Sequence, residues 1–315
     1  MKDLFKHASS SWVRYSRYEW RKDKNNKYYI TPAPEAMPRI YDPLKEYQQM
    51  VLDALNVGLM IRQSTKRKIR EAIMDFVSRY GLLGLMTALP TTPTFIDYKV
   101  VYFLTNHFIR EEVLDTETYL GYFFPFEKPD FRKKGKESVW FIQNDRTMIA
   151  LAMTFQKEPQ AQVMCFMRNY AERFDWLEQV FQDWSFTFLS SFLFYEDAEN
   201  LDEDTRDIYR QGMAAFGGIA PSYHVELRER PTIVWDYHSL LLAIQMMFSF
   251  MLADETSHLT LCRNCLKAFF TSEDTQDCCT DLKNELSAMA QSSKFHSNRI
   301  GLQDAISSTN PTRYR

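Results

Sequence analysis

The sequence predicts a mainly α-helical protein, in which a large helical domain is accompanied by a short N-terminal β-hairpin and a small C-terminal zinc-finger-like module. Apolar residues recur at spacings of three and four across several long segments, which is typical of helices with one buried face. Only 9 of the 315 residues are Gly and 15% are aromatic, which favours helices packed through large side chains. Four of the five Cys lie between positions 262 and 279, which indicates a separate small module.

Residues 1–38 are expected to form a basic, aromatic hairpin and a linker. Arg17–Arg21 and Tyr28–Thr31 flank the polar segment from Asp23 to Asn26, as the two strands of a hairpin flank its turn. Such a hairpin could clamp a single strand of nucleic acid, but we expect its aromatic rings to cover the core while its charges stay solvated. The segment Thr31–Pro38 is rich in proline and is predicted to be a stiff linker.

Residues 39–257 are predicted to form the large helical domain. Helix starts are expected at Asp42, at Ser64 or Thr65, and at Asp115. The second of these helices carries a run of positive charges that is a solvated face or, less favoured, a phosphate contact: Lys66, Arg67, Lys68 and Arg70.

Two later helices are expected to build the centre of this domain. An apolar stripe predicts a long helix over Pro159–Tyr195, and the segment Tyr237–Ala253, capped by Asp236, is apolar on every side and is expected at the centre. A short strand is expected at Thr232–Trp235, after a flexible loop that includes His224.

One cluster outside the module has the spacing of metal ligands. His107 would lie one helical turn from Glu111 and Glu112, a spacing at which two side chains can share a metal ion. We interpret these residues as a surface or capping cluster because no further ligand lies nearby.

The module at residues 258–291 contains the candidate metal ligands Cys262, Cys265, Cys278 and Cys279. Two thiolates three positions apart can be directed at one tetrahedral ion by a single tight turn, and a second pair a dozen residues later would complete the site. Adjacent side chains on a helix point about 100° apart, so Cys278 and Cys279 are not expected to bind one ion together. We therefore predict one zinc ion held by the first pair and one of the second, with Cys278 favoured.

The fourth ligand is left open by the sequence. His258, His296, an acidic side chain or water could complete the site. Alternatively the metal has been lost, and apolar packing alone holds the module through Phe269, Phe270, Leu282 and Leu286.

The pattern Cys-x-x-Cys, an aromatic pair, and then Cys followed by Lys283-Asn284 at a helix start resembles the treble-clef-like fingers at the C-termini of many uncharacterised bacterial proteins, among them the CGNR class. The resemblance covers about the last sixth of the chain. If Cys278 takes the position of the third ligand in this pattern, Leu282 stands where the fourth Cys is expected. The resemblance implies a helical domain ahead of the finger and a nucleic-acid-binding or regulatory role.

No phosphate loop, dinucleotide fingerprint, Gly-x-Ser-x-Gly or His-Glu-x-x-His motif occurs, so the sequence gives no support for an enzyme. We expect a cytoplasmic regulatory protein without a membrane segment, because the Cys are clustered and no signal-peptide-like segment is present. The net charge of −3 gives no global attraction to nucleic acid, so binding would need a local patch. The candidate phosphate contacts are Lys267, Lys283, Lys294 and Arg299.

Two other functions remain open from the sequence. The finger could serve protein–protein interaction or stability only, or the helical domain could bind a small ligand. Residues 292–315 are Ser-rich and are expected to be a flexible tail.

Overall fold

A computed structural model describes residues 8–61, 63–88, 100–102, 108–126, 168–196, 200–214, 221–237, 239–253, 258–262 and 265–271. The helices in this part of the chain have the following bounds: η1 Pro43–Lys45, α2 Tyr47–Ile61, α3 Lys66–Tyr80, α4 Leu85–Ala88, α5 Thr116–Phe123, α8 Phe174–Glu196, α9 Glu203–Ala214 and α10 Leu240–Leu252. The strands are β1 Ala8–Ser10, β2 Trp12–Tyr15, β3 Tyr18–Lys22, β4 Tyr28–Pro32, β5 Pro38–Tyr41, β6 Val100–Tyr102, β7 Val113–Asp115, β8 Glu172–Arg173, β9 Ser222–Leu227, β10 Pro231–Asp236, β11 His258–Leu261 and β12 Ala268–Thr271.

The fold is mixed α/β, so the predicted mainly α class is wrong. The described strands form five small sheets, in the orders β1-β10-β9, β3-β4-β8, β2-β5, β6-β7 and β11-β12. Residues 8–41 contain five strands and not a single hairpin. Strands of two to six residues contain too few apolar–polar alternations to be recognised from the sequence. The longer helices give a clear repeat of apolar residues and dominate the hydrophobic pattern.

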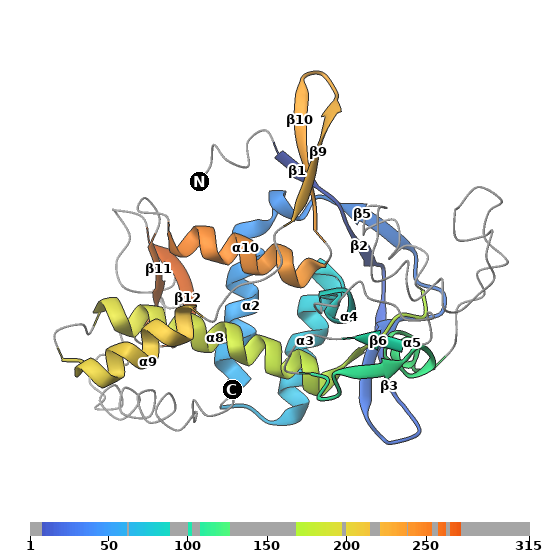
Figure 1. Cartoon of the computed structure of the whole chain (residues 1–315), viewed down its shortest axis with the longest axis horizontal. Coiled ribbons are helices and arrows are strands. Elements are labelled where there is room, and N and C mark those ends of the chain that lie inside the picture. The colour runs from blue at the N-terminus through green and yellow to red at the C-terminus, as the bar shows by residue number, and fades with distance from the viewer. Residues whose placement is uncertain are drawn as a thin grey trace, which may run out of the picture.

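Helices α2, α3, α8 and α10 form the centre of the structure, with α2 packed against the other three (Figure 1). At the crossing of α2 and α8 the helices approach so closely that only glycine fits. A Cβ atom added to Gly58 would lie 2.0 Å from the carbonyl oxygen of Phe181. The predicted apolar stripe of α8 is confirmed as core, since Leu177, Phe181 and Phe188 are at most 1% exposed.

The N-terminal strands share this core with the helices. Trp12 and Val13 of β2 are 1% exposed, and the indole nitrogen Nε1 of Trp12 donates to the carbonyl oxygen of Leu82 at 3.0 Å. Ala33 and Ala36, in the segment predicted as a linker, are also buried in the same core. Both sides of the boundary predicted at residue 38 therefore contribute to one hydrophobic core.

Several local predictions are confirmed. Strands β3 and β4 pair as a hairpin in which Lys22 lies opposite Tyr28. Thr65 caps α3 and Asp115 caps α5, each by accepting a backbone N–H of the first turn. Asp42 is a cap as predicted, but of the short 3-10 helix η1, and the long helix expected from it begins only at Tyr47.

Other element boundaries were wrong. Helix α8 begins at Phe174, because the preceding Glu172 and Arg173 pair with β4 as strand β8; residues 159–167 lie outside the described residues. Helix α10 begins at Leu240 with Ser239 as its cap, and its Ser249 and Phe250 are exposed, so it is not buried on every side.

The structure also differs from two predictions that concern the surroundings of His residues. His224 lies in strand β9 and not in a loop. Glu111 and Glu112 are non-helical, so the helix expected for them is wrong, but both are exposed, as the predicted surface position requires; His107 lies outside the described residues. No helix in the described part of the chain combines the length and the apolar character needed to cross a membrane.

Candidate metal centre at the C-terminal hairpin

The first two predicted metal ligands, Cys262 and Cys265, lie in the tight turn that joins β11 to β12. Leu266 donates its N–H to the carbonyl oxygen of Cys262 at 2.9 Å, and Cys262 donates its N–H to the carbonyl oxygen of Lys267 at 2.9 Å. The first of these bonds spans four residues, as in one turn of a helix. Residues three apart in such a turn lie on the same side, which suits Cys262 and Cys265 as a pair of ligands for one ion. We refer to residues 262–267 as the knuckle.

Leu266 adopts a backbone conformation that is unusual for its residue type. Its φ angle is +58°, in the left-handed region, where a residue with a Cβ atom costs about 1–2 kcal/mol. The side chain of Leu266 packs against the hydrophobic core, which compensates for part of this strain. Residues in such conformations are enriched at binding sites. They persist there because contacts with the surrounding structure hold the backbone in place.

The two thiols of the knuckle have different surroundings. Cys262 is 0% exposed, whereas Cys265 is half-buried and lines a cavity. Within the described ranges, no group of three or more His, Cys, Asp or Glu side chains is placed to hold a metal. Cys278 and Cys279 lie outside the described residues. The knuckle therefore contains two of the three predicted thiolate ligands, and the predicted zinc ion stays a prediction.

Asn56 of α2 fixes the knuckle to the helical core. Its amide nitrogen Nδ2 donates to the carbonyl oxygen of Ala268 at 3.2 Å, and its oxygen Oδ1 accepts the N–H of Ala268 at 2.8 Å. The side chain thus pairs with β12 as a neighbouring strand would. Leu261 and Ala268, which face each other across the hairpin, are both buried in the core. The hairpin is therefore seated on the helices.

A cavity of about 530 Å³ lies between the knuckle and the helices α2 and α3. Its polar wall contains an ion pair between Arg79 Nη1 and Asp53 Oδ2 at 2.7 Å, and the hydroxyl of Tyr80 donates to the same carboxylate oxygen at 2.8 Å. Burial, together with this bond to Asp53, raises the pKa of Tyr80. Asp75 and Lys267 complete the charged lining. The cavity therefore carries charges of both signs in a fixed arrangement.

These cavity residues were not identified from the sequence. A signal was present in α2, where Gln49, Asp53 and Asn56 interrupt the apolar pattern at spacings of four and three. The side chains of Gln49 and Asp53 are hydrogen-bonded at 2.8 Å. A polar stripe along an otherwise buried helix indicates polar partners, but the partner elements come from α3 and β12, which the sequence did not connect to α2.

Of the four predicted phosphate contacts, only Lys267 lies within the described residues. It is exposed at the end of the knuckle, and it lines the cavity that also contains Asp53 and Asp75. Lys283, Lys294 and Arg299 lie outside the described residues. The structure thus places one of the predicted cations next to the first two Cys and does not test the other three.

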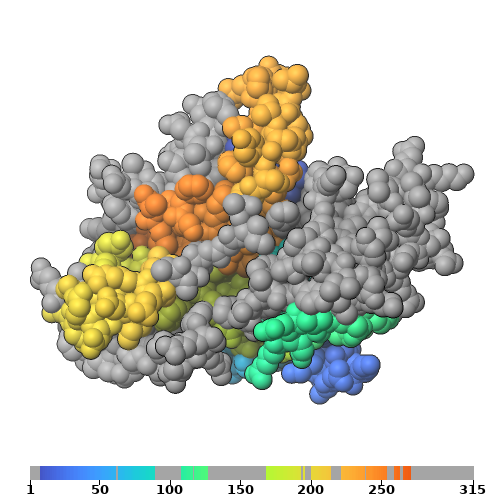
Figure 2. Space-filling model, in the orientation of Figure 1, coloured from blue at the N-terminus to red at the C-terminus, as the bar shows by residue number. Residues whose placement is uncertain are grey.

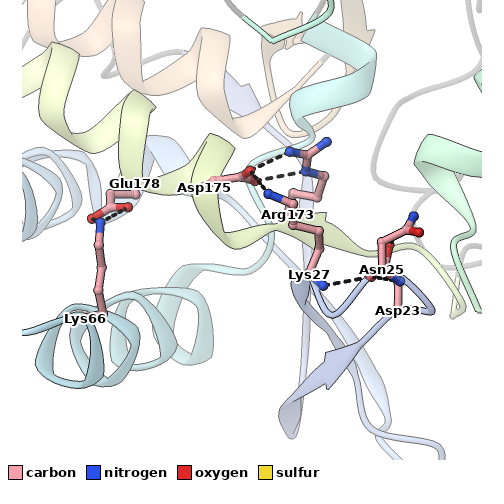
Figure 3. Close-up of polar contacts among 7 residues, drawn as sticks. All are labelled: Asp23, Asn25, Lys27, Lys66, Arg173, Asp175 and Glu178. Carbon is pink, nitrogen blue, oxygen red and sulfur yellow. Dashed lines mark hydrogen bonds and ion pairs between the residues drawn. The ribbon is translucent and has the colours of Figure 1, made fainter.

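The basic run at the start of α3 is engaged with other parts of the protein. Lys66 Nζ lies 2.7 Å from Glu178 Oε2 of α8 (Figure 3), and Arg67 pairs with Glu71. The guanidinium of Arg70 lies 4.5 Å from the ring centre of Tyr28. These contacts favour the interpretation of the run as part of the folded surface over a phosphate-binding site.

The basic residues of the N-terminal hairpin are engaged in the same way. Lys27 lies 3.7 Å from Asp175, which also binds Arg173 (Figure 3), and Lys22 lies over the ring of Tyr28. Trp20 packs edge-on against Phe174 at 5.7 Å between ring centres. The aromatic residues of this hairpin therefore cover the core, as the favoured prediction has it.

Glu172 is a buried carboxylate that was not identified from the sequence. Its two oxygens accept the N–H groups of Leu83, Gly84 and Leu85 and the hydroxyl of Tyr170, with the last bond at 3.0 Å. Burial raises the pKa of Glu172, and these four donors oppose the rise. Because its oxygens are occupied by donors of the protein itself, the residue fixes the segment before α4 and is not a candidate for catalysis.

Comparisons of the chain with protein-family models, with curated proteins and with solved structures found no match.

Proposed function

We propose that the chain is a cytoplasmic regulatory protein whose C-terminal module binds one zinc ion and contacts nucleic acid. Cys262 and Cys265 supply two thiolates, and Cys278 or Cys279 supplies a third. When bound, the ion would fix the loop that follows β12 in relation to the knuckle, as structural zinc does in small modules. Lys267, next to the knuckle, and the predicted cations beyond it would bind phosphate groups.

One observation carries the proposal, namely the backbone of the knuckle. The bond from Leu266 to Cys262 closes one turn around the Cys-x-x-Cys segment, and Leu266 holds a strained left-handed conformation directly after the second Cys. A turn of this shape places the side chains of Cys262 and Cys265 on one side, as two ligands of one ion require.

The metal part of the proposal is tested by zinc analysis of the full chain purified without chelator. We expect close to one equivalent of zinc, and less than about a tenth of an equivalent in the Cys262→Ser/Cys265→Ser double variant. The matched control is Cys165→Ser, which changes the one Cys outside the cluster and should leave the zinc content unchanged. Wild-type protein without zinc would contradict the proposal and would favour a module held by apolar packing.

The nucleic-acid part is tested by the salt dependence of binding to a short DNA and a short RNA. Each phosphate contact lowers the logarithm of the association constant by about 0.7–0.9 per tenfold rise in salt, so four contacts predict a slope near −3. Lys267→Gln should reduce the slope by about one contact. A zinc-bound protein that binds neither nucleic acid at low salt would instead support a protein-interaction role for the module.

A second candidate function is the binding of a small ligand in the cavity between α2, α3 and the knuckle. The observation that favours it is the volume of about 530 Å³ with a preformed Asp53–Arg79 pair in its wall, which lies within the range of small-molecule sites. Such a ligand would carry a positive group that binds Asp53. It would also carry a negative or hydrogen-bonding group that binds Arg79. A thermal-shift screen of zwitterionic and amide-containing compounds, with Asp53→Asn as the control variant, tests this function.

A further inference from the structure

The hairpin of β9 and β10 extends away from the body of the protein (Figures 1 and 2). Its neighbour β1 pairs with β10, so the sheet has the order β1-β10-β9 and β9 lies at its edge. Among the described residues no strand pairs with the outer side of β9. A strand of six residues with an open edge is a site where another strand can add.

One face of this hairpin is apolar and exposed. Tyr223, Val225 and Leu227 alternate along β9 and therefore share a face, and they are 65%, 57% and 86% exposed. Ile233, opposite Val225 on β10, is 42% exposed on the same face. An exposed apolar surface on a protruding element indicates an interaction site, because leaving it in water is unfavourable.

Backbone hydrogen bonds show which residues of β9 have free N–H and C=O groups. Arg228 donates to the carbonyl oxygen of Arg230 across the hairpin, so its backbone faces β10. The N–H and C=O groups of successive residues point to opposite edges of a strand. Those of residues 223, 225 and 227 therefore point toward the open edge of β9. The carbonyl of Trp235, opposite Tyr223, accepts from the hydroxyl of Ser10 in β1, which agrees with this alternation.

The order of charges along β9 favours a second copy of the same strand as the partner. In an antiparallel pair centred on Val225, His224 of each copy lies opposite Glu226 of the other, and Tyr223 lies opposite Leu227. The register centred on residue 226 would place Glu226 opposite Glu226, and the register centred on residue 224 would place His224 opposite His224. Only the first of these three registers places His224 opposite a carboxylate and apolar residues opposite each other. Within its own hairpin, His224 also contacts Asp236 and Glu226.

We propose that the chain forms a symmetric dimer in which β9 of one copy pairs antiparallel with β9 of a second copy, centred on Val225. The pairing joins two three-stranded sheets and makes about six backbone hydrogen bonds, two for each of the three facing pairs. This proposal does not depend on the zinc site or on nucleic-acid binding.

The mass of the protein in solution tests the dimer. Sedimentation velocity of the full chain at about 1–100 µM should show a species of twice the 37.4 kDa monomer, increasing with concentration. Val225→Pro removes the outward N–H at the centre of the pair and should leave only monomer, whereas Val225→Thr keeps that N–H and should still dimerise. Far-ultraviolet circular dichroism checks that both variants are folded.

A charge exchange tests the register. His224→Glu places Glu opposite Glu226 twice in the dimer and should weaken dimerisation about tenfold. Among the three registers, the double variant His224→Glu/Glu226→Lys restores opposite charges across the pair only in the one centred on Val225. It also restores them between residues 224 and 226 of each copy, which lie 3.3 Å apart in the wild type, and it should recover most of the lost affinity. A wild-type monomer at all concentrations, a dimer that persists in Val225→Pro, or a double variant weaker than His224→Glu would each overturn the proposal.

Discussion

Replacing Gly58 by alanine tests the closest helix contact of the fold. An added Cβ would lie 2.0 Å from the carbonyl oxygen of Phe181 and 2.7 Å from the Cβ of Ser185. An ordinary carbon–oxygen contact is about 3.2 Å, so α2 and α8 would have to separate by roughly 1 Å along their shared core. Neither of these atoms lies at the end of a flexible side chain, so the strain cannot be relieved by a rotamer change.

The magnitude follows from two opposing effects. Overpacking in a core costs about 1–3 kcal/mol, and a contact with backbone belongs at the upper end of that range. Alanine gains about 1 kcal/mol over glycine in a helix interior. We therefore expect Gly58→Ala to lower the free energy of unfolding by about 2 kcal/mol.

Gly121→Ala is the matched control, because Gly121 also lies in a helix but has no atom within 4 Å of an added Cβ. Only the helix preference then applies, and we expect stability to rise by up to about 1 kcal/mol. Urea unfolding followed by tryptophan fluorescence measures both variants. A Gly58→Ala protein as stable as the wild type would show that α2 and α8 do not pack as described, and our reasoning about the core would fail.

Two further predictions concern polar groups in the interior. Asn56→Ala removes both hydrogen bonds to Ala268, so we expect a loss of about 2 kcal/mol and faster amide hydrogen exchange in β12, while exchange in α3 stays as in the wild type. Glu172→Gln replaces one acceptor oxygen by an N–H₂ group facing a donor, and at low pH this should destabilise the protein by about 1–3 kcal/mol. Burial raises the pKa of Glu172 above its ordinary 4.5, so its stabilising contribution is full below that pH and falls as pH rises through the folded-state value. The difference between wild type and Glu172→Gln in urea unfolding should therefore be larger at pH 4.5 than at pH 8, and an increase with pH would contradict the direction of the shift.

Features that depend on neighbouring residues could be predicted from the sequence. The caps at Asp42, Thr65 and Asp115 could be predicted because a capping side chain binds the N–H of a residue two or three positions ahead. The hairpin of β3 and β4 could be predicted because its turn lies between the two strands that pair. The Cys262–Cys265 pair could be identified because both residues belong to one turn, as predicted metal ligands of one ion would.

Contacts between segments far apart in the chain could be seen only in the tertiary structure. Strand β1 pairs with β10 more than 200 residues later, and β8 joins the sheet of β3 and β4 instead of starting a helix. Asn56 meets Ala268, and Glu172 meets the segment at Leu83, only after the chain has folded. Such contacts have no periodicity and no fixed spacing, because each depends on the packing of elements that the local sequence does not specify.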